Sequence, residues 1–116
     1  MMEDCIFCKI SNNEIPRETI YENDNFFSVP DANPKIEGHS LVISKKHFKT
    51  FLDLPSSLGQ ELMDCIKKTT MKLLDETKAG GFNIINNNFE VAGQIVPHFH
   101  FHILPRKEGD GFNLLK

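Results

Sequence analysis

The stretch of sequence that decides the fold is His98-Phe99-His100-Phe101-His102-Ile103-Leu104, in which histidines alternate with apolar residues. A β-strand directs successive side chains to opposite faces of its sheet. We therefore expect Phe99, Phe101 and Ile103 to face the core and the three histidines to share the other face. At about 3.3 Å per residue, successive histidines lie roughly 6.6 Å apart at Cα, so their rings can meet on one ligand.

Two kinds of chemistry suit such a row of histidines. A His-x-His pair on a strand can bind a catalytic zinc ion, which would activate a water molecule as the nucleophile. Alternatively, a neutral imidazole can itself attack phosphorus, because a substantial fraction of histidine is unprotonated near neutral pH. The residue types alone leave both alternatives open.

Four more strands are expected outside this stretch, because β-branched and aromatic runs are separated there by turn-forming residues. The first two are joined by the turn 22–25 and should form a hairpin. The expected strands are 19–21, 26–29, 39–44 and 82–86.

One long helix is predicted between the third and fourth of these strands. It should begin at Pro55-Ser56-Ser57, where Ser57 and Gln60 have the spacing of a capping box, and end at Gly80-Gly81. A buried face with a spacing of three and four residues is formed by Leu58, Leu62, Cys65, Ile66, Thr69 and Leu73. With the strands, this helix predicts a single α+β domain over residues 1–116, with a mostly antiparallel sheet.

The composition narrows the function. The chain has 116 residues, and its 13 Lys and Arg against 16 Asp and Glu give a net charge of −3 without a basic run, which disfavours a polymeric nucleic acid as partner. A signal peptide and an apolar run of about 20 residues are both missing from the sequence, so we expect a cytoplasmic protein without a membrane partner. Three cysteines favour reduced thiols over a disulfide scaffold.

The histidine stretch resembles the His-φ-His-φ-His-φ-φ signature of the histidine triad (HIT) family, whose members are nucleotide hydrolases and transferases. The similarity extends to positions along nearly the whole chain. These are Asp31, His39, Leu41-Val42-Ile43, Lys45-Lys46-His47, Asn87, Ala92-Gly93-Gln94 and Leu104-Pro105-Arg106. The resemblance implies a five-stranded antiparallel sheet with two helices, one of them long, and a homodimer.

The resemblance also implies an activity. It makes His100 the nucleophile that attacks the α-phosphorus of a purine nucleotide and breaks a P–N or P–O bond, as in a nucleoside phosphoramidase or a related hydrolase. His102 would bind the phosphate, with His39 beside it. Asp31 would accept hydrogen bonds from the ribose hydroxyls. Asn87 and Gln94 would complete the nucleotide site.

Two residues depart from the family pattern. Ile95 stands where many Hint-like members have Ser or Thr to donate a hydrogen bond toward the scissile phosphate. Phe89 occupies a loop position that is often Gly. Neither change removes the nucleophile, but both bear on the rate and on the choice of leaving group. A nucleotide-binding or interaction protein with little catalysis is therefore the alternative function.

Cys5-Ile6-Phe7-Cys8 has the two-residue gap of a zinc knuckle, although a structural zinc ion needs four ligands. Some bacterial Hint-like proteins resemble this chain in carrying the pair, and they complete the site with histidines that correspond to His47 and His98. The resemblance thus implies one structural zinc ion per chain and leaves His100 free of metal. A zinc-dependent metallohydrolase built on the triad itself is the competing interpretation.

Overall fold

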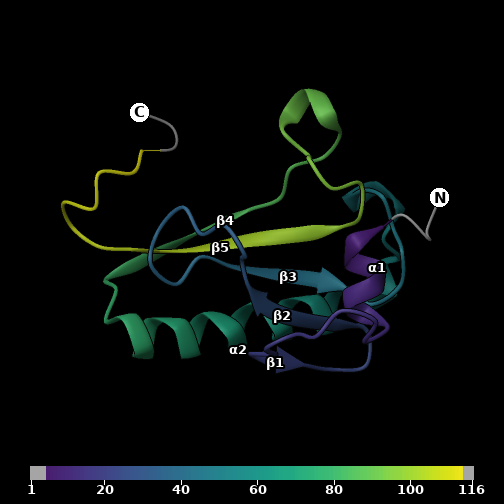
Figure 1. Cartoon of the computed structure of the whole chain (residues 1–116), viewed down its shortest axis with the longest axis horizontal. Coiled ribbons are helices and arrows are strands. Elements are labelled where there is room, and N and C mark those ends of the chain that lie inside the picture. The colour runs from purple at the N-terminus through teal and green to yellow at the C-terminus, as the bar shows by residue number, and fades with distance from the viewer. Residues whose placement is uncertain (1–4, 114–116) are drawn as a thin grey trace.

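The computed structural model describes residues 5–113 and confirms the predicted fold, a five-stranded antiparallel sheet with two helices (Figure 1). The strands are β1 (Tyr21–Glu22), β2 (Phe26–Pro30), β3 (Ser40–Ser44), β4 (Gly81–Ile85) and β5 (His100–Arg106). The helices are α1 (Ile6–Ser11) and the long α2 (Gly59–Thr77), with short 3-10 helices η2 (Phe51–Asp53), η3 (Ser56–Leu58) and η4 (Glu90–Ala92). In this part of the chain, no helix has the length and apolar character needed to cross a bilayer.

The sheet has the order β1-β2-β3-β5-β4, so the histidine strand β5 lies between β3 and β4. Ile43 pairs with His100 and Leu41 with His102, which places these four side chains on one face. The alternation is confirmed, since Phe99 and Ile103 are fully buried in the core on the opposite face and Phe101 packs against that core.

The predicted start of the histidine strand was two residues too early. Phe99 donates its backbone N–H to the carbonyl of Phe48 at 2.6 Å, outside the sheet, and His98 lies in a bend. The ladder with β3 begins only at His100. His98 is thereby freed from the strand and belongs to a different site from His100.

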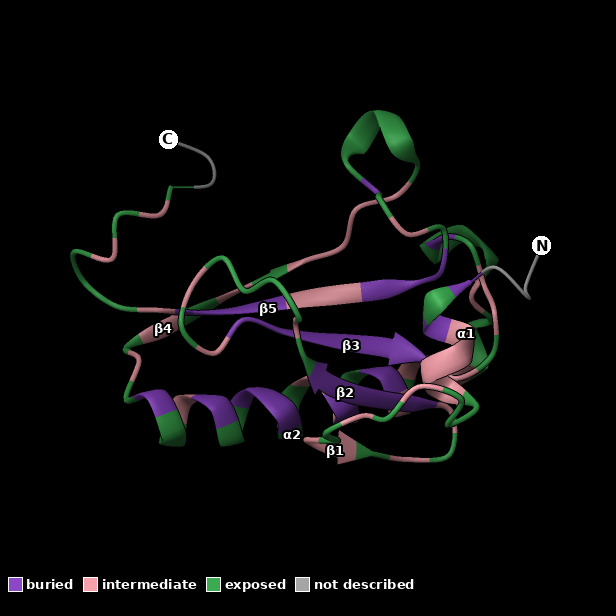
Figure 2. Cartoon of the chain, in the orientation of Figure 1, coloured by how far each residue is buried: buried purple, intermediate pink, exposed green. Residues whose placement is uncertain are grey.

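The long helix covers one face of the sheet, and its predicted buried face is largely correct (Figure 2). Its predicted ends were wrong. Ser56 to Leu58 form η3, so α2 begins at Gly59, and the capping box is made by Thr50 and Asp53 of η2 instead of Ser57 and Gln60. The helix ends at Thr77 because Lys78 adopts a left-handed conformation with a φ of 62°.

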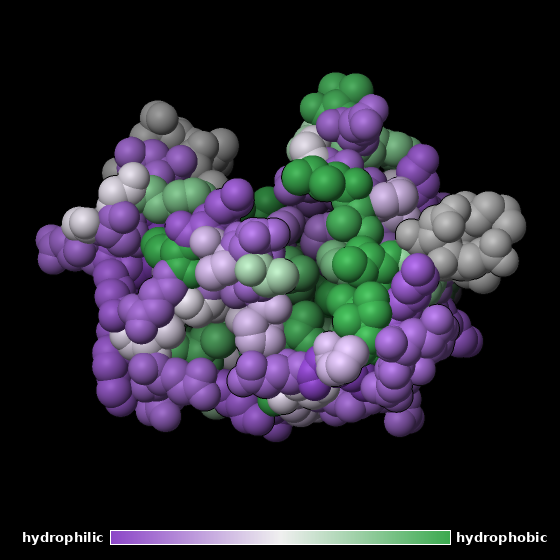
Figure 3. All heavy atoms as spheres, in the orientation of Figure 1, coloured by the Kyte–Doolittle hydropathy of each residue, from purple (hydrophilic) through white to green (hydrophobic). Residues whose placement is uncertain are grey.

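The short helix α1 packs on one end of the face that carries His100 and His102 (Figure 1). Its apolar cluster consists of Cys5, Phe7, Phe27, Val29, Leu41 and Ile43. Strand β3 is therefore buried along its whole length, between this cluster and the α2 core (Figure 2). Figure 3 shows apolar side chains gathered on the surface that faces the viewer, between α1 and the loop that carries η4.

Candidate active site

His100 is held as a neutral imidazole with one free lone pair. Its Nδ1 lies 2.7 Å from the backbone carbonyl of His98, and because that oxygen can only accept, Nδ1 carries the proton. Nε2 is then unprotonated. Burial lowers the pKa of His100 below its usual value, so the ring is neutral near pH 7. Asn86 donates its side-chain N–H to the His100 carbonyl at 2.9 Å and fixes the backbone from the other side.

His102 is held in the opposite tautomer by a relay of hydrogen bonds. The backbone N–H of Lys35 donates to Nδ1 of His39 at 3.0 Å, so a neutral His39 carries its proton on Nε2. That Nε2–H lies 3.0 Å from Nδ1 of His102 and donates to it. His102 therefore presents an N–H at Nε2. Burial, followed by the neighbouring His100 and His39, lowers the pKa of His102 to about 4.

Asp31 lies beside this relay, where β2 ends. One of its carboxylate oxygens is 3.3 Å from Nε2 of His39, and the other accepts the backbone N–H of Asn33 at 2.8 Å. The β2–β3 turn thus brings Asp31 and His39 together, and Asp31 is both a turn-forming residue and a member of the site.

Asp31, His39 and His102 place three ligand atoms within 4.8 Å of one another, as a metal site would. The tautomer relay argues against a metal ion there. A neutral imidazole has one lone pair, and His39 already uses it at Nδ1 to accept the Lys35 N–H. Coordination through Nε2 would require an imidazolate, so the cluster suits proton donation better than a catalytic metal.

The loop over residues 87–97 is closed by Gln94. This buried side chain accepts the backbone N–H of Phe89 at 2.7 Å and donates to the carbonyl of Lys49 at 2.6 Å. Asn87 packs beside Gly93, while Ile95 is 92% exposed. Phe89 has a φ of 70°, in the left-handed region that favours glycine, so this aromatic residue takes up a strained position in the loop.

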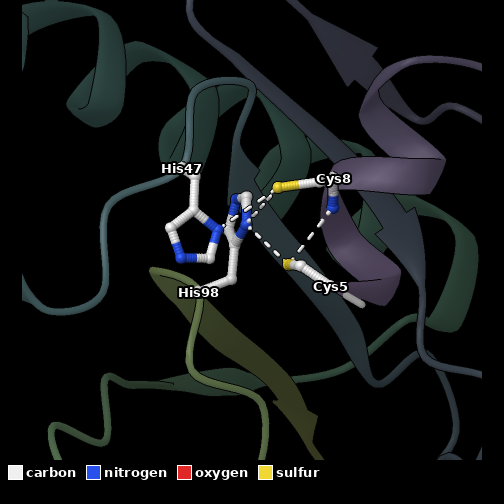
Figure 4. A group of neighbouring side chains, drawn as sticks. All are labelled: Cys5, Cys8, His47 and His98. Carbon is white, nitrogen blue, oxygen red and sulfur yellow. Dashed lines mark hydrogen bonds between the residues drawn. The ribbon is translucent and has the colours of Figure 1, made fainter. Parts of the chain in front are cut away.

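The second site brings together Cys5, Cys8, His47 and His98, as the sequence predicted (Figure 4). Cys5 caps α1 and Cys8 lies in its first turn, while His47 follows β3 and His98 precedes β5. Nδ1 of His98 is 3.2 Å from the Cys5 sulfur and 3.5 Å from the Cys8 sulfur, and Nδ1 of His47 is 3.2 Å from the Cys8 sulfur.

These residues fit a zinc ion. Zinc bonds of about 2.1 Å to nitrogen and about 2.3 Å to sulfur put tetrahedral N and S ligands about 3.5 Å apart, close to the separations observed here. Nε2 of His98 is 2.7 Å from the Ser44 carbonyl and must donate to it, so the lone pair on Nδ1 points toward the sulfurs. Burial lowers the pKa of His98 to about 4, which keeps this ligand neutral.

Several groups that contact or orient these histidines were missed in the sequence. Phe7 packs edge-on against the rings of both His98 and His100, with centroid distances of 5.7 and 4.9 Å. The Ser44 carbonyl and the Lys35 N–H orient one histidine each. Backbone groups carry no signature in the sequence, whereas Phe7 could have been suspected because it is an apolar residue inside a Cys-x-x-Cys motif.

The family of the chain follows from its similarity to known proteins. The family model of the HIT domain matches residues 12–109, which is most of the chain. The chain belongs to the histidine triad family. Among its HIT relatives is an uncharacterized HIT-like protein from Methanocaldococcus jannaschii, 49% identical over 109 residues, with 92% of this chain and 82% of the relative covered.

Two other relatives carry names that state an activity. Adenylylsulfatase HINT3 of Arabidopsis thaliana is 37% identical, and the match covers 95% of this chain and 56% of that protein. Adenosine 5'-monophosphoramidase HNT1 of Candida albicans is also 37% identical, and the match covers 90% of this chain and 71% of that protein.

Solved HIT structures have the same fold. A HIT family protein from Bacillus subtilis superposes with a TM-score of 0.90 at 37% identity, covering 97% of this chain and 81% of that one. A Zn-bound histidine triad family protein from Mycobacterium smegmatis superposes with a TM-score of 0.85 at 33% identity, covering 98% of this chain and 83% of that one.

Proposed function

We propose that this HIT protein is a nucleotidyl hydrolase or transferase that uses His100 as a covalent nucleophile on the α-phosphorus of a purine nucleotide. The observation that carries the proposal is the hydrogen bond from Nδ1 of His100 to the His98 carbonyl, which leaves an unprotonated Nε2 on a neutral ring. The activities named for the Candida and Arabidopsis relatives support the same class of substrate.

In the first step, the Nε2 lone pair of His100 forms a bond to phosphorus while the P–N or P–O bond to the leaving group breaks, and the leaving group takes up a proton from water. The Nε2–H of His102 donates to a phosphate oxygen and stabilises the charge that develops there. Water then attacks the nucleotidyl-imidazole, and the nucleoside monophosphate leaves. Because the two rings have opposite tautomers, His100 has a lone pair at Nε2 for attack and His102 has an N–H at Nε2 for donation.

The proposed contacts to the ribose, the base and the leaving group are assigned to residues that lie near His100 and His102 or on the 87–97 loop. Asp31 accepts hydrogen bonds from the two ribose hydroxyls, and Ile10 and Val96 at the border of the α1 cluster offer apolar surface to the base. Asn87, on the same loop as Gln94, would contact the phosphate or the leaving group. Gln94 contributes by holding the 87–97 loop closed, because both ends of its amide are bonded to backbone.

A structural zinc ion at Cys5, Cys8, His47 and His98 is part of this proposal, supported by the donor set and by the Zn-bound Mycobacterium smegmatis relative. When bound, it cross-links the start of α1 to the residue that precedes β5. Native mass spectrometry should find one zinc ion per chain. Cys8→Ser should lower both zinc content and melting temperature, since metal binding is coupled to folding. An unchanged melting curve without zinc would remove the site.

We also propose a cytoplasmic homodimer. Strand β4 is the edge of the sheet, and its Phe82 and Ile84 are 44% and 43% exposed, so pairing with a second copy would bury apolar surface. A reducing compartment suits the three cysteines, none of which is in a disulfide.

The test of the function is direct capture of the adduct. After rapid acid quench with adenosine 5'-phosphoramidate, wild type should carry a nucleoside monophosphate on an imidazole nitrogen, and His100→Gly should carry none. Lys67→Ala, on the exposed side of α2, serves as the control and should behave as wild type. Turnover by His100→Gly near the wild-type rate would overturn the proposal. Nucleotide binding by wild type without turnover of phosphoramidates, dinucleoside polyphosphates or nucleotidyl sugars would favour a binding protein.

A further inference from the structure

The cysteine pair is linked to His100 by two short routes. The first passes through His98, whose ring contacts the Cys5 sulfur at 3.2 Å and whose carbonyl accepts the His100 N–H at 2.7 Å. The second passes through Phe7, which lies between Cys5 and Cys8 in sequence and packs against the His98 and His100 rings. A change at the two sulfurs therefore reaches the orientation of the nucleophile.

The two sulfurs differ in access. Cys5 is 7% exposed and Cys65 is fully buried, whereas Cys8 is half-buried. Cys8 lines a surface pocket of about 610 Å³ together with Lys9, Lys46 and His47. A small oxidant can thus reach the Cys8 sulfur from solvent.

Cys5 and Cys8 are also placed to form a disulfide with each other. They occupy the N-cap and the first turn of α1, and the Cys8 backbone N–H already contacts the Cys5 sulfur at 3.4 Å. Their ligand atoms lie within 4.8 Å of each other. Cys-x-x-Cys at the start of a helix is an arrangement in which thiols and disulfides interconvert.

We propose that Cys5 and Cys8 form an oxidation site for hydroperoxides, and that their disulfide switches off His100. The inference rests on the proposed function of His100. The Cys8 thiolate attacks the peroxide, the O–O bond breaks, and a sulfenic acid and water (or an alcohol) are formed. The Cys5 thiolate then displaces hydroxide to form the S–S bond. Two electrons pass from the sulfurs to the peroxide, and two protons come from water. The disulfide sulfurs no longer carry the negative charge that a zinc ligand supplies.

The disulfide disables the nucleophile by removing its support. Once the sulfurs bond to each other, the Nδ1 side of His98 loses its partners, and Phe7 follows the helix start to which it belongs. The His98 ring then keeps only its Nε2 hydrogen bond to the Ser44 carbonyl, so the His98 carbonyl that fixes the tautomer and direction of His100 is held less firmly. A displacement of about 1 Å at the attacking group can lower turnover roughly 100-fold.

The experiment treats zinc-loaded protein with hydrogen peroxide and follows three signals together. These are zinc release to a chromophoric chelator, loss of two hydrogens in the intact mass, and turnover of adenosine 5'-phosphoramidate. We expect zinc release and disulfide formation to run in parallel with a roughly 100-fold loss of turnover. A dithiol reductant with added zinc should restore turnover.

Two variants distinguish the effect of the Cys5–Cys8 pair from that of Cys65. Cys8→His keeps a ligand that zinc accepts but cannot form the disulfide, so peroxide should change its turnover far less than that of wild type when each protein is compared with its own untreated sample. Cys65→Ala should respond to peroxide as wild type does. Retention of zinc by peroxide-treated wild type would overturn the oxidation site, and full turnover of the disulfide form would overturn the link to His100. Failure of the proposed function would look different, because the reduced protein would then turn over nothing while zinc release still reports on the cysteines.

Discussion

Nδ1–H of His100 donates a hydrogen bond to the backbone carbonyl of His98, 2.7 Å away, so these two histidines of the motif differ in what they contact and in their proposed roles. The His98 ring faces the cysteines, whereas its main-chain carbonyl orients His100, the proposed nucleophile. Removal of the His98 side chain therefore tests the metal site, whereas the bond that prepares His100 for attack is made by a backbone group that no substitution of His98 deletes.

We expect the two tautomers to be observable by NMR. Long-range ¹H–¹⁵N spectra near pH 7 should show His100 protonated on Nδ1 and His102 on Nε2, because of the acceptors and donors around them. His39→Ala should release His102 into a mixture of tautomers and lower turnover about tenfold or more. His39→Gln, which keeps a donor, should recover part of the loss. The same tautomer on both rings of wild type would contradict this assignment.

Acid should destabilise the fold through the buried histidines. The pKa of His102, which faces His100, His39 and Asp31, falls to about 4 in the folded protein. Between about pH 4 and 6.5 the unfolded chain therefore binds more protons, so the free energy of unfolding should rise with pH across this window and then level off. Urea unfolding at several pH values measures the slope. His102→Gln should reduce it by up to about 1.4 kcal/mol per pH unit, and an equal slope in both proteins would exclude His102 as a contributor.

Gly38 should be irreplaceable. It has a φ of +86°, and a Cβ there would lie 2.8 Å from a Thr77 methyl group and 2.9 Å from the Pro105 ring. Gly38→Ala should cost about 1–3 kcal/mol of stability and lower turnover by displacing the adjacent His39. Gly80→Ala is the matched control, since a Cβ at Gly80 meets nothing within 4 Å. Equal melting temperatures for the two variants would refute the steric argument.

The homodimer can be tested at the edge strand. Sedimentation should give about twice the 13.3 kDa chain mass, and Ile84→Lys should shift the equilibrium toward monomer by placing a charge on the exposed apolar edge. Lys67→Ala should remain dimeric. A wild-type monomer at micromolar concentration would rule out the assembly.

Much of the fold was predictable because it follows from local periodicity. The alternation of the histidine strand correctly predicted that Phe99 and Ile103 are buried, and helical spacing predicted the burial of Leu62, Cys65 and Leu73. The helix ends were not predictable in the same way. Ser57 and Gln60 have capping-box spacing, but Ser57 lies in the 3-10 helix η3 that precedes α2. At the other end of α2, the left-handed position is taken by Lys78 and not by a glycine.

The residues of the candidate site could be predicted from the sequence, whereas the hydrogen bonds between them could not. The motif and its resemblance identified His39 and His102, but their contact depends on the register of β3 and β5, which places residues 63 positions apart within 3.0 Å. The tautomers depend on the backbone N–H of Lys35 and the backbone carbonyl of His98, and every residue type except proline supplies both groups. A chemical role that rests on main-chain atoms leaves no trace in composition or spacing.

The position of β5 between β3 and β4 also bears on how the protein is made. Every other strand precedes β5 in the described chain, yet β5 occupies an inner place in the sheet. Before β5 has left the ribosome, β3 and β4 each present an unpaired edge. His100 and His98, the last of the four proposed zinc ligands along the chain, are then not yet in place. A nascent chain therefore completes its sheet, its core and the proposed zinc and histidine sites only when β5 pairs with both neighbours, and translation products that stop before β5 would be prone to aggregate.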